Sequence, residues 1–258
     1  MTPAQAHKQR ILAQHAAESG EDVQAAEPYR RLAAALADDR RVLEQIKSFA
    51  DKTQAKKGMV QKYLPWLEDV AKSGRPQAYD PVFSTAVLWL IDIGELDTAV
   101  PYALFAIRHE MTFRDDYRRD LPDLLIEEIA VQFGTGAVLS AANHTALLDL
   151  IGNADPETGM HTLNLSDIVR AKFYKASGEA AEADDDLPAA AAFYESALKY
   201  SEKIGVKSRL SAIRKQLQGR PSPTGRAQAC GKSPRKCGGL RPQRPCAPYS
   251  EACPPGGL

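Results

Sequence analysis

Apolar residues recur with the period of an α-helix over most of the first 220 residues. From Tyr29 to about Lys57 they follow one another at steps of three, four and seven positions, with charged residues on the opposite side. The apolar stripe consists of Leu32, Leu36, Leu43, Ile46 and Phe49 or Ala50. This spacing predicts one long N-terminal amphipathic helix, which Gly58 ends.

Glycine, proline and polar turn signals divide the rest of the chain into shorter predicted helices. A short helix begins near Tyr63-Leu-Pro-Trp66 and closes at residues 73–76. Further helices are predicted at about 82–93, 98–111, from Pro122 onward, and at 144–151, 165–178, 187–201 and 207–217. The charged residues 114–120 are expected to form a loop. Strand patterns are scarce, so the expected fold class is all-α, built from helical hairpins.

Two of the predicted hairpins share a spacing of small and aromatic residues. Leu96, Ala99, Tyr102 and Ala106 of the first correspond to Leu187, Ala190, Phe193 and Ala197 of the second. Small residues let two helices approach closely while the aromatic ring fills the gap. The spacing is typical of tetratricopeptide pairs, but the copies are about 90 residues apart instead of 34. Two independent hairpins are the preferred interpretation, and a helical-repeat adaptor that binds protein is the alternative.

Residues 221–258 differ in composition from everything before them. They contain eight Pro, six Gly and four Cys but no Val, Ile, Phe, Met or Trp, so they bury too little apolar surface to offset chain entropy. We expect a disordered tail from residue 219 onward. Its cysteines lack the paired spacing of a zinc site, so no metal site is predicted at Cys230, Cys237, Cys246 and Cys253. A shifted reading frame is our hypothesis for the abrupt change after Arg220.

Charge is balanced overall, with 33 Lys and Arg against 33 Asp and Glu, but one segment is basic. Residues 40–62 contain only two acidic residues, Glu44 and Asp51. The basic residues of the segment, which are the candidate DNA-binding residues, are Arg40, Arg41, Lys47, Lys52, Lys56, Lys57 and Lys62. Lysine and arginine spaced along a helix fit the phosphates of nucleic acid. A solvated helix face is the alternative.

The sequence shows no complete catalytic motif. The phosphate-loop pattern GxxxxGK[ST] does not occur, and His109-Glu110 lacks the second histidine of HExxH. Acidic residues gather at 184–186 and in a second run, Asp115, Asp116, Asp120, Asp123, Glu127 and Glu128. Two local runs do not predict the converging carboxylates of a two-metal nuclease. Solvated charge, or pairing with Arg118 and Arg119, is preferred. No cofactor is predicted, and Mg²⁺ is expected only if the chain is an endonuclease.

Membrane insertion is not expected, since no run approaches the roughly 20 apolar residues that cross a bilayer. The N-terminus turns polar at once and lacks a secretory signal. We therefore expect a cytoplasmic protein without a membrane partner.

Several short motifs follow one another in a fixed order over roughly residues 3–217. They are Tyr63-Leu-Pro-Trp66, Val87-Leu-Trp89-Leu-x-x-x-Gly94-Glu-Leu-Asp-x-Ala99, Tyr102-Ala-Leu-Phe-Ala, Leu121-Pro, Glu127-Glu-Ile-Ala130, Ala189-Ala-Ala-Ala-Phe-Tyr-Glu-Ser-Ala-Leu198 and Gly205-Val-Lys. The ordered set resembles the small terminase subunits of peduovirus-type cohesive-end tailed phages. The residues after 220 depart from the ending usual in that family, which is rich in Lys, Pro and Ala.

The resemblance implies a subunit that recognises the cohesive-end packaging site in double-stranded viral DNA. Its partner would be the large terminase subunit, the ATPase motor, in the bacterial host cytoplasm. The family is described as the endonuclease subunit, but the residues show no nuclease site, so whether this chain is an enzyme stays open. The preferred hypothesis is a subunit that binds the site and directs the large subunit for genome cutting and packaging. The alternatives are a metal-dependent endonuclease that makes the cohesive-end cut itself and the protein-binding adaptor.

The resemblance also implies a ring or other closed homo-oligomer. We expect the long amphipathic helix to supply the contacts, through Leu32, Leu36, Leu43 and Ile46. The predicted organisation therefore has three parts. Residues 1–62 form a helical arm for oligomerisation and DNA binding, residues 63–218 a body of helical hairpins, and residues 219–258 the tail.

Overall fold

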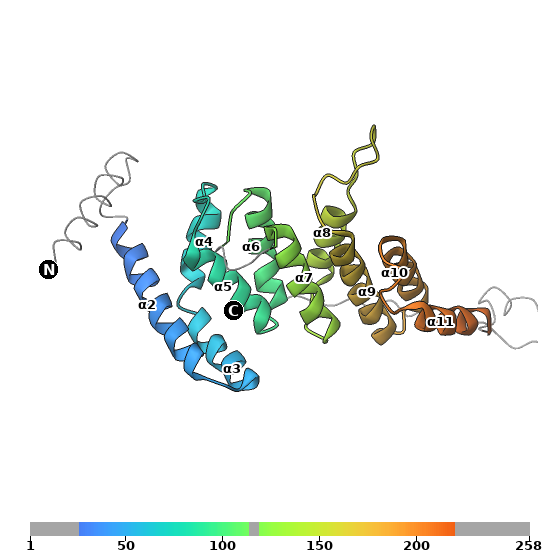
Figure 1. The fold of residues 1–258 in the computed structure, drawn as a ribbon, viewed down its shortest axis with the longest axis horizontal. Coiled ribbons are helices and arrows are strands. Elements are labelled where there is room, and N and C mark those ends of the chain that lie inside the picture. Colours follow the sequence, from blue (N-terminus) through green and yellow to red (C-terminus); the bar gives the residue numbers. More distant parts are fainter. Residues whose placement is uncertain (1–25, 114–118, 220–258) are drawn as a thin grey trace, which may run out of the picture. The chain divides into compact units, whose positions relative to one another are not determined.

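The structure is a computed structural model that describes residues 26–113 and 119–219 (Figure 1). All regular structure in these two ranges is helical, apart from isolated bridges between Tyr79 and Thr112 and between Ala154 and His161. The all-α prediction is confirmed. The tail, its four cysteines and most of the predicted loop 114–120 lie outside the described residues. None of the described helices has the length and apolarity needed to span a membrane.

Ten helices make up the described ranges. They are α2 (Ala26–Gln45), α3 (Phe49–Val60), α4 (Leu64–Ser73), α5 (Pro81–Asp92), α6 (Leu96–Arg108), α7 (Leu121–Gly134), α8 (Ala141–Gly152), α9 (Asp167–Ala183), α10 (Leu187–Tyr200) and α11 (Lys207–Gly219). Proline stands in the first turn of α4, α5, α7 and α10, where its missing N–H costs nothing. From α5 onward the predicted helices are confirmed to within a few residues at each end.

The prediction of a single helix from Tyr29 to about Lys57 is wrong, because two helices occupy this segment. Residues 46–48 leave the helical conformation, and Ser48 has extended backbone angles (φ −70°, ψ 131°). The Ser48 hydroxyl accepts a hydrogen bond from the Asp51 amide at 3.3 Å and caps α3. Serine competes for backbone groups in this way, so it favours a helix start over a helix interior. Gly58 does not end the helix, which continues to Val60.

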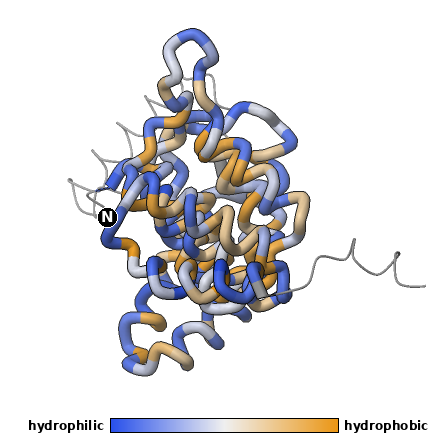
Figure 2. Tube along the Cα trace, turned by 90° about the vertical axis from the view of Figure 1, so that its right-hand side faces the viewer, coloured by the Kyte–Doolittle hydropathy of each residue, from blue (hydrophilic) through white to orange (hydrophobic). Residues whose placement is uncertain are grey.

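Helix α5 lies at the centre of the core and contacts α2, α3, α4, α6 and α7. Most of its residues are buried, as expected for a helix that is apolar on all sides. Its start is fixed by Asp80, 2% exposed, which accepts hydrogen bonds from the amides of Val82 and Phe83 and from the Trp66 indole. Figure 2 shows hydrophobic stretches gathered where helices face one another.

One apolar cluster extends from Leu36 on α2 to Phe173 on α9. Helices α2 and α3 therefore share the core of the predicted body, although residue 62 was the predicted boundary between the two parts. The division of function at this residue stays a prediction.

Helices α9 and α10 form a closely packed hairpin, with α7 on the other side of α9. A Cβ atom added to Gly178 would lie 2.5 Å from Tyr194 Cε1, well inside van der Waals contact. The close approach is made at Gly178, which is not among the small residues that the sequence prediction named. The ring that fills the gap is Tyr194, which is fully buried, and the sequence prediction of Phe193 is wrong: Phe193 is half-buried beside His144.

A short hairpin connects α8 to α9 and extends beyond the end of α8 (Figure 1). The Asp155 amide donates to the Met160 carbonyl at 2.8 Å, and the Thr162 amide donates to the Asn153 carbonyl at 3.1 Å. The base of the hairpin is held from α9 by Arg170.

Arg170 is 2% exposed, and its guanidinium donates hydrogen bonds to the carbonyls of Ile151 and Leu163. Its central carbon lies 5.9 Å from the centre of the Tyr200 ring. Ile151 is at the C-terminal end of α8, where the helix dipole favours a cation. In the described ranges no carboxylate pairs with this buried charge. The Arg170 guanidinium is instead satisfied by backbone carbonyls.

Candidate nucleic-acid interface

The seven basic residues predicted to bind DNA surround the corner between α2 and α3. Four of them are engaged inside the chain. The pairs are Arg40 with Thr85, Arg41 with Asp38, Lys56 with Asp92 and Lys62 with Asp39. Arg40 and Lys56 tie α2 and α3 to α5, and Lys62 ties the segment after α3 to α2, whereas Arg41 and Asp38 form an exposed pair within α2.

Three of these contacts are partly buried, and the two that reach α5 link the most distant parts of the chain. Arg40 Nη2 donates to Thr85 Oγ1, and Lys56 Nζ lies 2.5 Å from Asp92 Oδ2 with the lysine side chain only 20% exposed. A phosphate at Lys56 would have to displace Asp92 from a partly buried ion pair. We therefore assign Arg40 and Lys56 to the stability of the corner.

Lys47, Lys52 and Lys57 are the remaining three, and we call them the corner lysines. Lys47 and Lys57 are exposed and Lys52 is partly exposed. Across residues 26–113 and 119–219, none of the three forms an ion pair or a side-chain hydrogen bond. Their charge is thus available to an outside anion. Phe49, beside Lys47 at the start of α3, is 89% exposed.

Three of the four residues predicted to form oligomer contacts lie on the face of α2 that packs inside the chain, and Ile46 follows the end of that helix. Leu36 and Leu43 are 3% and 8% exposed, and Leu32 and Ile46 are half-buried against the same core. Leu36 and Leu43 already have intrachain partners. A role for this stripe in oligomerisation stays a prediction.

The acidic run after residue 114 is only partly described, because Asp115 and Asp116 fall outside the described residues. Asp120 is exposed at the start of α7, and the Asp123 carboxylate accepts a hydrogen bond from the Ser166 amide at 2.8 Å. Glu127 accepts from both Lys172 and Arg119, which confirms the predicted pairing with Arg119. Two of the four described carboxylates of this run, Asp123 and Glu127, thus have partners of their own.

The two glutamates of this run have opposite pKa shifts. Burial acts to raise the pKa of Glu127, but the hydrogen bond and charge of Lys172 and the charge of Arg119 outweigh it and lower that pKa. Burial raises the pKa of Glu128, and the nearby charge of Asp92 adds to the effect. Among the residues that the structure describes, no three His, Cys, Asp or Glu side chains converge as metal ligands.

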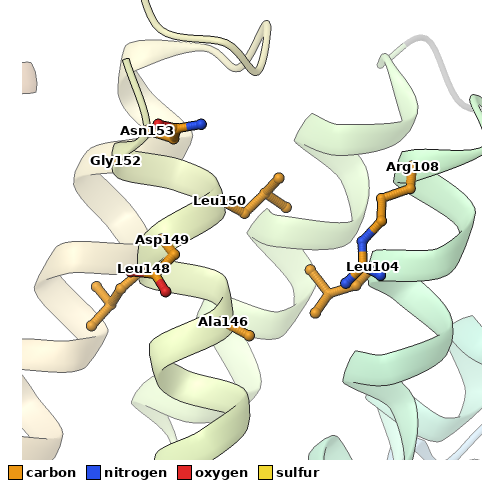
Figure 3. Close-up of a pocket in the computed structure, with 8 residues that line it drawn as sticks. All are labelled: Leu104, Arg108, Ala146, Leu148, Asp149, Leu150, Gly152 and Asn153. Carbon is orange, nitrogen blue, oxygen red and sulfur yellow. The ribbon is translucent and has the colours of Figure 1, made fainter. Parts of the chain in front are cut away.

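A hollow of about 610 Å³ lies between α6 and α8. Leu104 and Leu150 point toward each other across it, and the Arg108 side chain runs along its α6 edge (Figure 3). Its lining combines apolar side chains with Asn153, a single arginine and the Asp149 carboxylate, so it is less suited to a polyanion than the corner lysines.

A second group of lysines was not predicted from the sequence as a binding surface. Lys199, Lys203 and Lys215, near the end of α10 and on α11, also have no partner within the described ranges. Their neighbours are heavily paired: Lys207 with Glu202, Arg209 with Glu179 and Glu182, and Arg214 with Glu195. These carboxylates make the region mixed in charge, whereas only two acidic residues stand among residues 40–62.

Comparison with known proteins agrees with the resemblance seen in the sequence. Residues 33–160 match the family model described as "Phage small terminase subunit". Over 256 residues the chain is 27% identical to the "Terminase, endonuclease subunit" of Escherichia phage P2, and the match covers 97% of this chain and 99% of that protein. No solved structure matches the chain.

The family match includes the α2–α3 corner and all three corner lysines. The P2 match extends past Arg220, since it covers 97% of the chain. The shifted-frame hypothesis for the tail stays a prediction, and reading the gene in its other two frames tests it. Residues 33–160, about half of the chain, thus match the phage small terminase subunit family, and this match supports a role in phage DNA packaging.

Proposed function

We propose that this subunit binds the cohesive-end packaging site of double-stranded viral DNA through the corner lysines. It then directs the large ATPase subunit to that site for genome cutting and packaging. One observation carries the proposal: Lys47, Lys52 and Lys57 have no partner in the described chain, whereas the other four basic residues of the segment are engaged. The family match supports viral DNA as the polyanion.

Salt dependence of binding tests the proposal. Each phosphate contact releases counterions, so the logarithm of the binding constant falls with the logarithm of salt concentration by about 0.9 per contact. The triple variant Lys47→Gln, Lys52→Gln, Lys57→Gln should bind a cohesive-end duplex more weakly. Its slope should be shallower by about 2.7 for each contacting protomer. Fluorescence anisotropy of a labelled duplex at several salt concentrations measures both quantities.

A matched control removes three positive charges from the other lysine group. The variant Lys199→Gln, Lys203→Gln, Lys215→Gln should keep the wild-type slope and affinity. If the salt dependence of DNA binding becomes shallower in this control but not in the corner-lysine variant, the DNA surface lies at α10 and α11. If wild type fails to bind DNA at low salt but still binds the large subunit, the protein-binding adaptor is favoured.

The P2 relative is named as an endonuclease subunit, which raises the endonuclease alternative. We propose that the cut depends on the large subunit, and that the purified small subunit with Mg²⁺ binds cohesive-end DNA without nicking it. A supercoiled plasmid that carries the site, incubated with and without the large subunit, tests this. Nicking by the small subunit alone, abolished in the variant Asp115→Asn, Asp116→Asn, would favour the endonuclease instead.

A closed homo-oligomer is part of the proposal, and its contacts need a variant that does not unfold the core. Leu36 and Leu43 are unsuitable because they are buried. Leu32→Ser, at a half-buried position of α2, should lower the native mass while helicity by circular dichroism is kept. An unchanged native mass would exclude this position as a contact.

A further inference from the structure

We infer that Phe49 acts as an apolar wedge against the base pairs of the DNA held by the corner lysines. The inference rests on the proposed function and extends it, because it adds a residue that senses how easily the duplex deforms. The surface concerned is α3 from Phe49 to Lys57 together with Lys47.

The first observation is the exposure of Phe49. At 89% it is the most exposed large apolar side chain in the described ranges, and it belongs to neither apolar cluster. Burying a phenylalanine side chain stabilises a protein by about 1.5–3 kcal/mol. Phe49 does not contribute this to the fold, because its ring stays exposed. An exposed ring at a helix corner therefore points to a partner.

The second observation is the charge around the ring. With 3.6 residues per turn, Lys52 lies about 60° to one side of Phe49 on the helix and Lys57 about 80° to the other. Lys47 stands two residues before it. The ring thus lies between cations that have no partners in the described chain.

These charges favour DNA over a second copy that meets the ring across a two-fold axis. A second copy that approached through the same surface would bring the same three lysines together, and like charges repel. A duplex instead offers phosphates on both sides of an apolar base step. Phenylalanine is among the residues that insert between base steps from the minor groove and kink the duplex. Pyrimidine–purine steps kink most easily, so the contact should favour them.

The experiment uses the full-length protein and a cohesive-end duplex with 2-aminopurine at successive pyrimidine–purine steps. Unstacking raises the fluorescence of this base, so wild type should produce an increase at one step. Phe49→Ala should abolish the increase and weaken binding by about 5- to 150-fold, as loss of a base–aromatic contact does. Its salt slope should stay at the wild-type value. Phe49→Trp, which keeps an aromatic ring, should retain binding and the fluorescence increase.

Val138→Ala is the matched control, because Val138 is 76% exposed and lies on the loop before α8. It should leave affinity, fluorescence and native mass unchanged. If Phe49→Ala binds as wild type while the corner-lysine variant loses binding, the wedge is overturned and the proposed function stands. If Phe49→Ala lowers the native mass, the ring contacts a second copy, and the wedge is again overturned. If the corner-lysine variant binds as wild type, the proposed DNA surface itself fails.

Discussion

The Tyr63 hydroxyl donates a hydrogen bond of 2.6 Å to Asp39 Oδ2 and thereby joins α2 to the residue before α4. Asp39 is 8% exposed, and its other oxygen accepts a hydrogen bond from Lys62 Nζ at 2.8 Å. Burial, followed by the hydrogen bond to Asp39, raises the pKa of Tyr63 well above its ordinary value. The hydroxyl therefore remains a donor at physiological pH, and the contact fixes the corner from its inner side.

Asp39→Ala should lower the free energy of unfolding by about 1–3 kcal/mol, because the Tyr63 hydroxyl is left buried without its acceptor. Urea denaturation followed by circular dichroism measures the change. Asp38→Ala is the neighbouring control. It removes an exposed ion pair with Arg41 and should change stability by about 0.5 kcal/mol or less. Equal losses in the two variants would contradict the role given to Asp39.

Gly178→Ala should destabilise the α9–α10 hairpin by about 1–3 kcal/mol, since the added methyl group meets the Tyr194 ring. Gly58→Ala is the control in another helix, where no atom lies within 4 Å of the added Cβ. It should stabilise the protein by up to about 1 kcal/mol, the difference in helix propensity. Thermal unfolding of both variants is the measurement, and the prediction fails if both shift in the same direction.

Burial lowers the pKa of His144. Its ring is half-buried near Phe133, Phe173 and Phe193, and its Nε2 lies 2.8 Å from Ser177 Oγ. The unfolded state has the ordinary pKa of about 6.5 and binds more protons than the folded state just below that pH. The contribution of His144 to stability is therefore present above about pH 6.5 and is lost as the pH falls toward the folded-state pKa.

Replacing His144 should thus flatten the pH dependence of stability. Between about pH 7.5 and 5.5, the free energy of unfolding should fall less in His144→Gln than in wild type. Chemical denaturation at a series of pH values gives this comparison. His109→Gln changes an exposed histidine and should keep the wild-type dependence. The assignment to His144 is refuted if His144→Gln follows the wild-type curve.

Arg170→Met should loosen the hairpin between α8 and α9, because the carbonyls of Ile151 and Leu163 lose a buried donor. Each unsatisfied group costs about 1–3 kcal/mol. Hydrogen exchange should speed up at the amides of Asp155 and Thr162, which the hairpin protects, while α5 keeps its protection.

Lys175→Met serves as control on the same helix, since Lys175 is partly exposed and has no partner in the described ranges. It should leave exchange in the hairpin unchanged. Unaltered exchange in Arg170→Met would show that the hairpin holds its shape without the guanidinium.

Helices α5 to α11 were predictable from the sequence because apolar periodicity runs through them and because proline stands in the first turn of α5, α7 and α10. The break before Ser48 was not predictable from the sequence, because the apolar stripe continues across it. Only the capping hydrogen bond marks the start of the new helix. A pattern of spacing reports which face is buried. It does not report where the backbone leaves and re-enters the helix.

The candidate site was predictable only as a set of charges. The sequence pointed to seven basic residues, but the partners of Arg40 and Lys56 lie 45 and 36 residues away along the chain. No local pattern reveals such contacts. A lysine with an intrachain partner therefore cannot be told from one without a partner by sequence alone. Phe49 was read as part of the apolar stripe for the same reason, although the corner carries it out of the core.

The contact between Gly178 and Tyr194 constrains how this protein can diverge. A side chain at position 178 requires the loss of ring atoms at position 194. The Tyr194 hydroxyl also donates to Glu182 at 2.8 Å, so a smaller residue there frees that carboxylate. In relatives that keep the hairpin, the three positions should therefore covary, and a lineage that replaces the glycine alone would have to separate the helices.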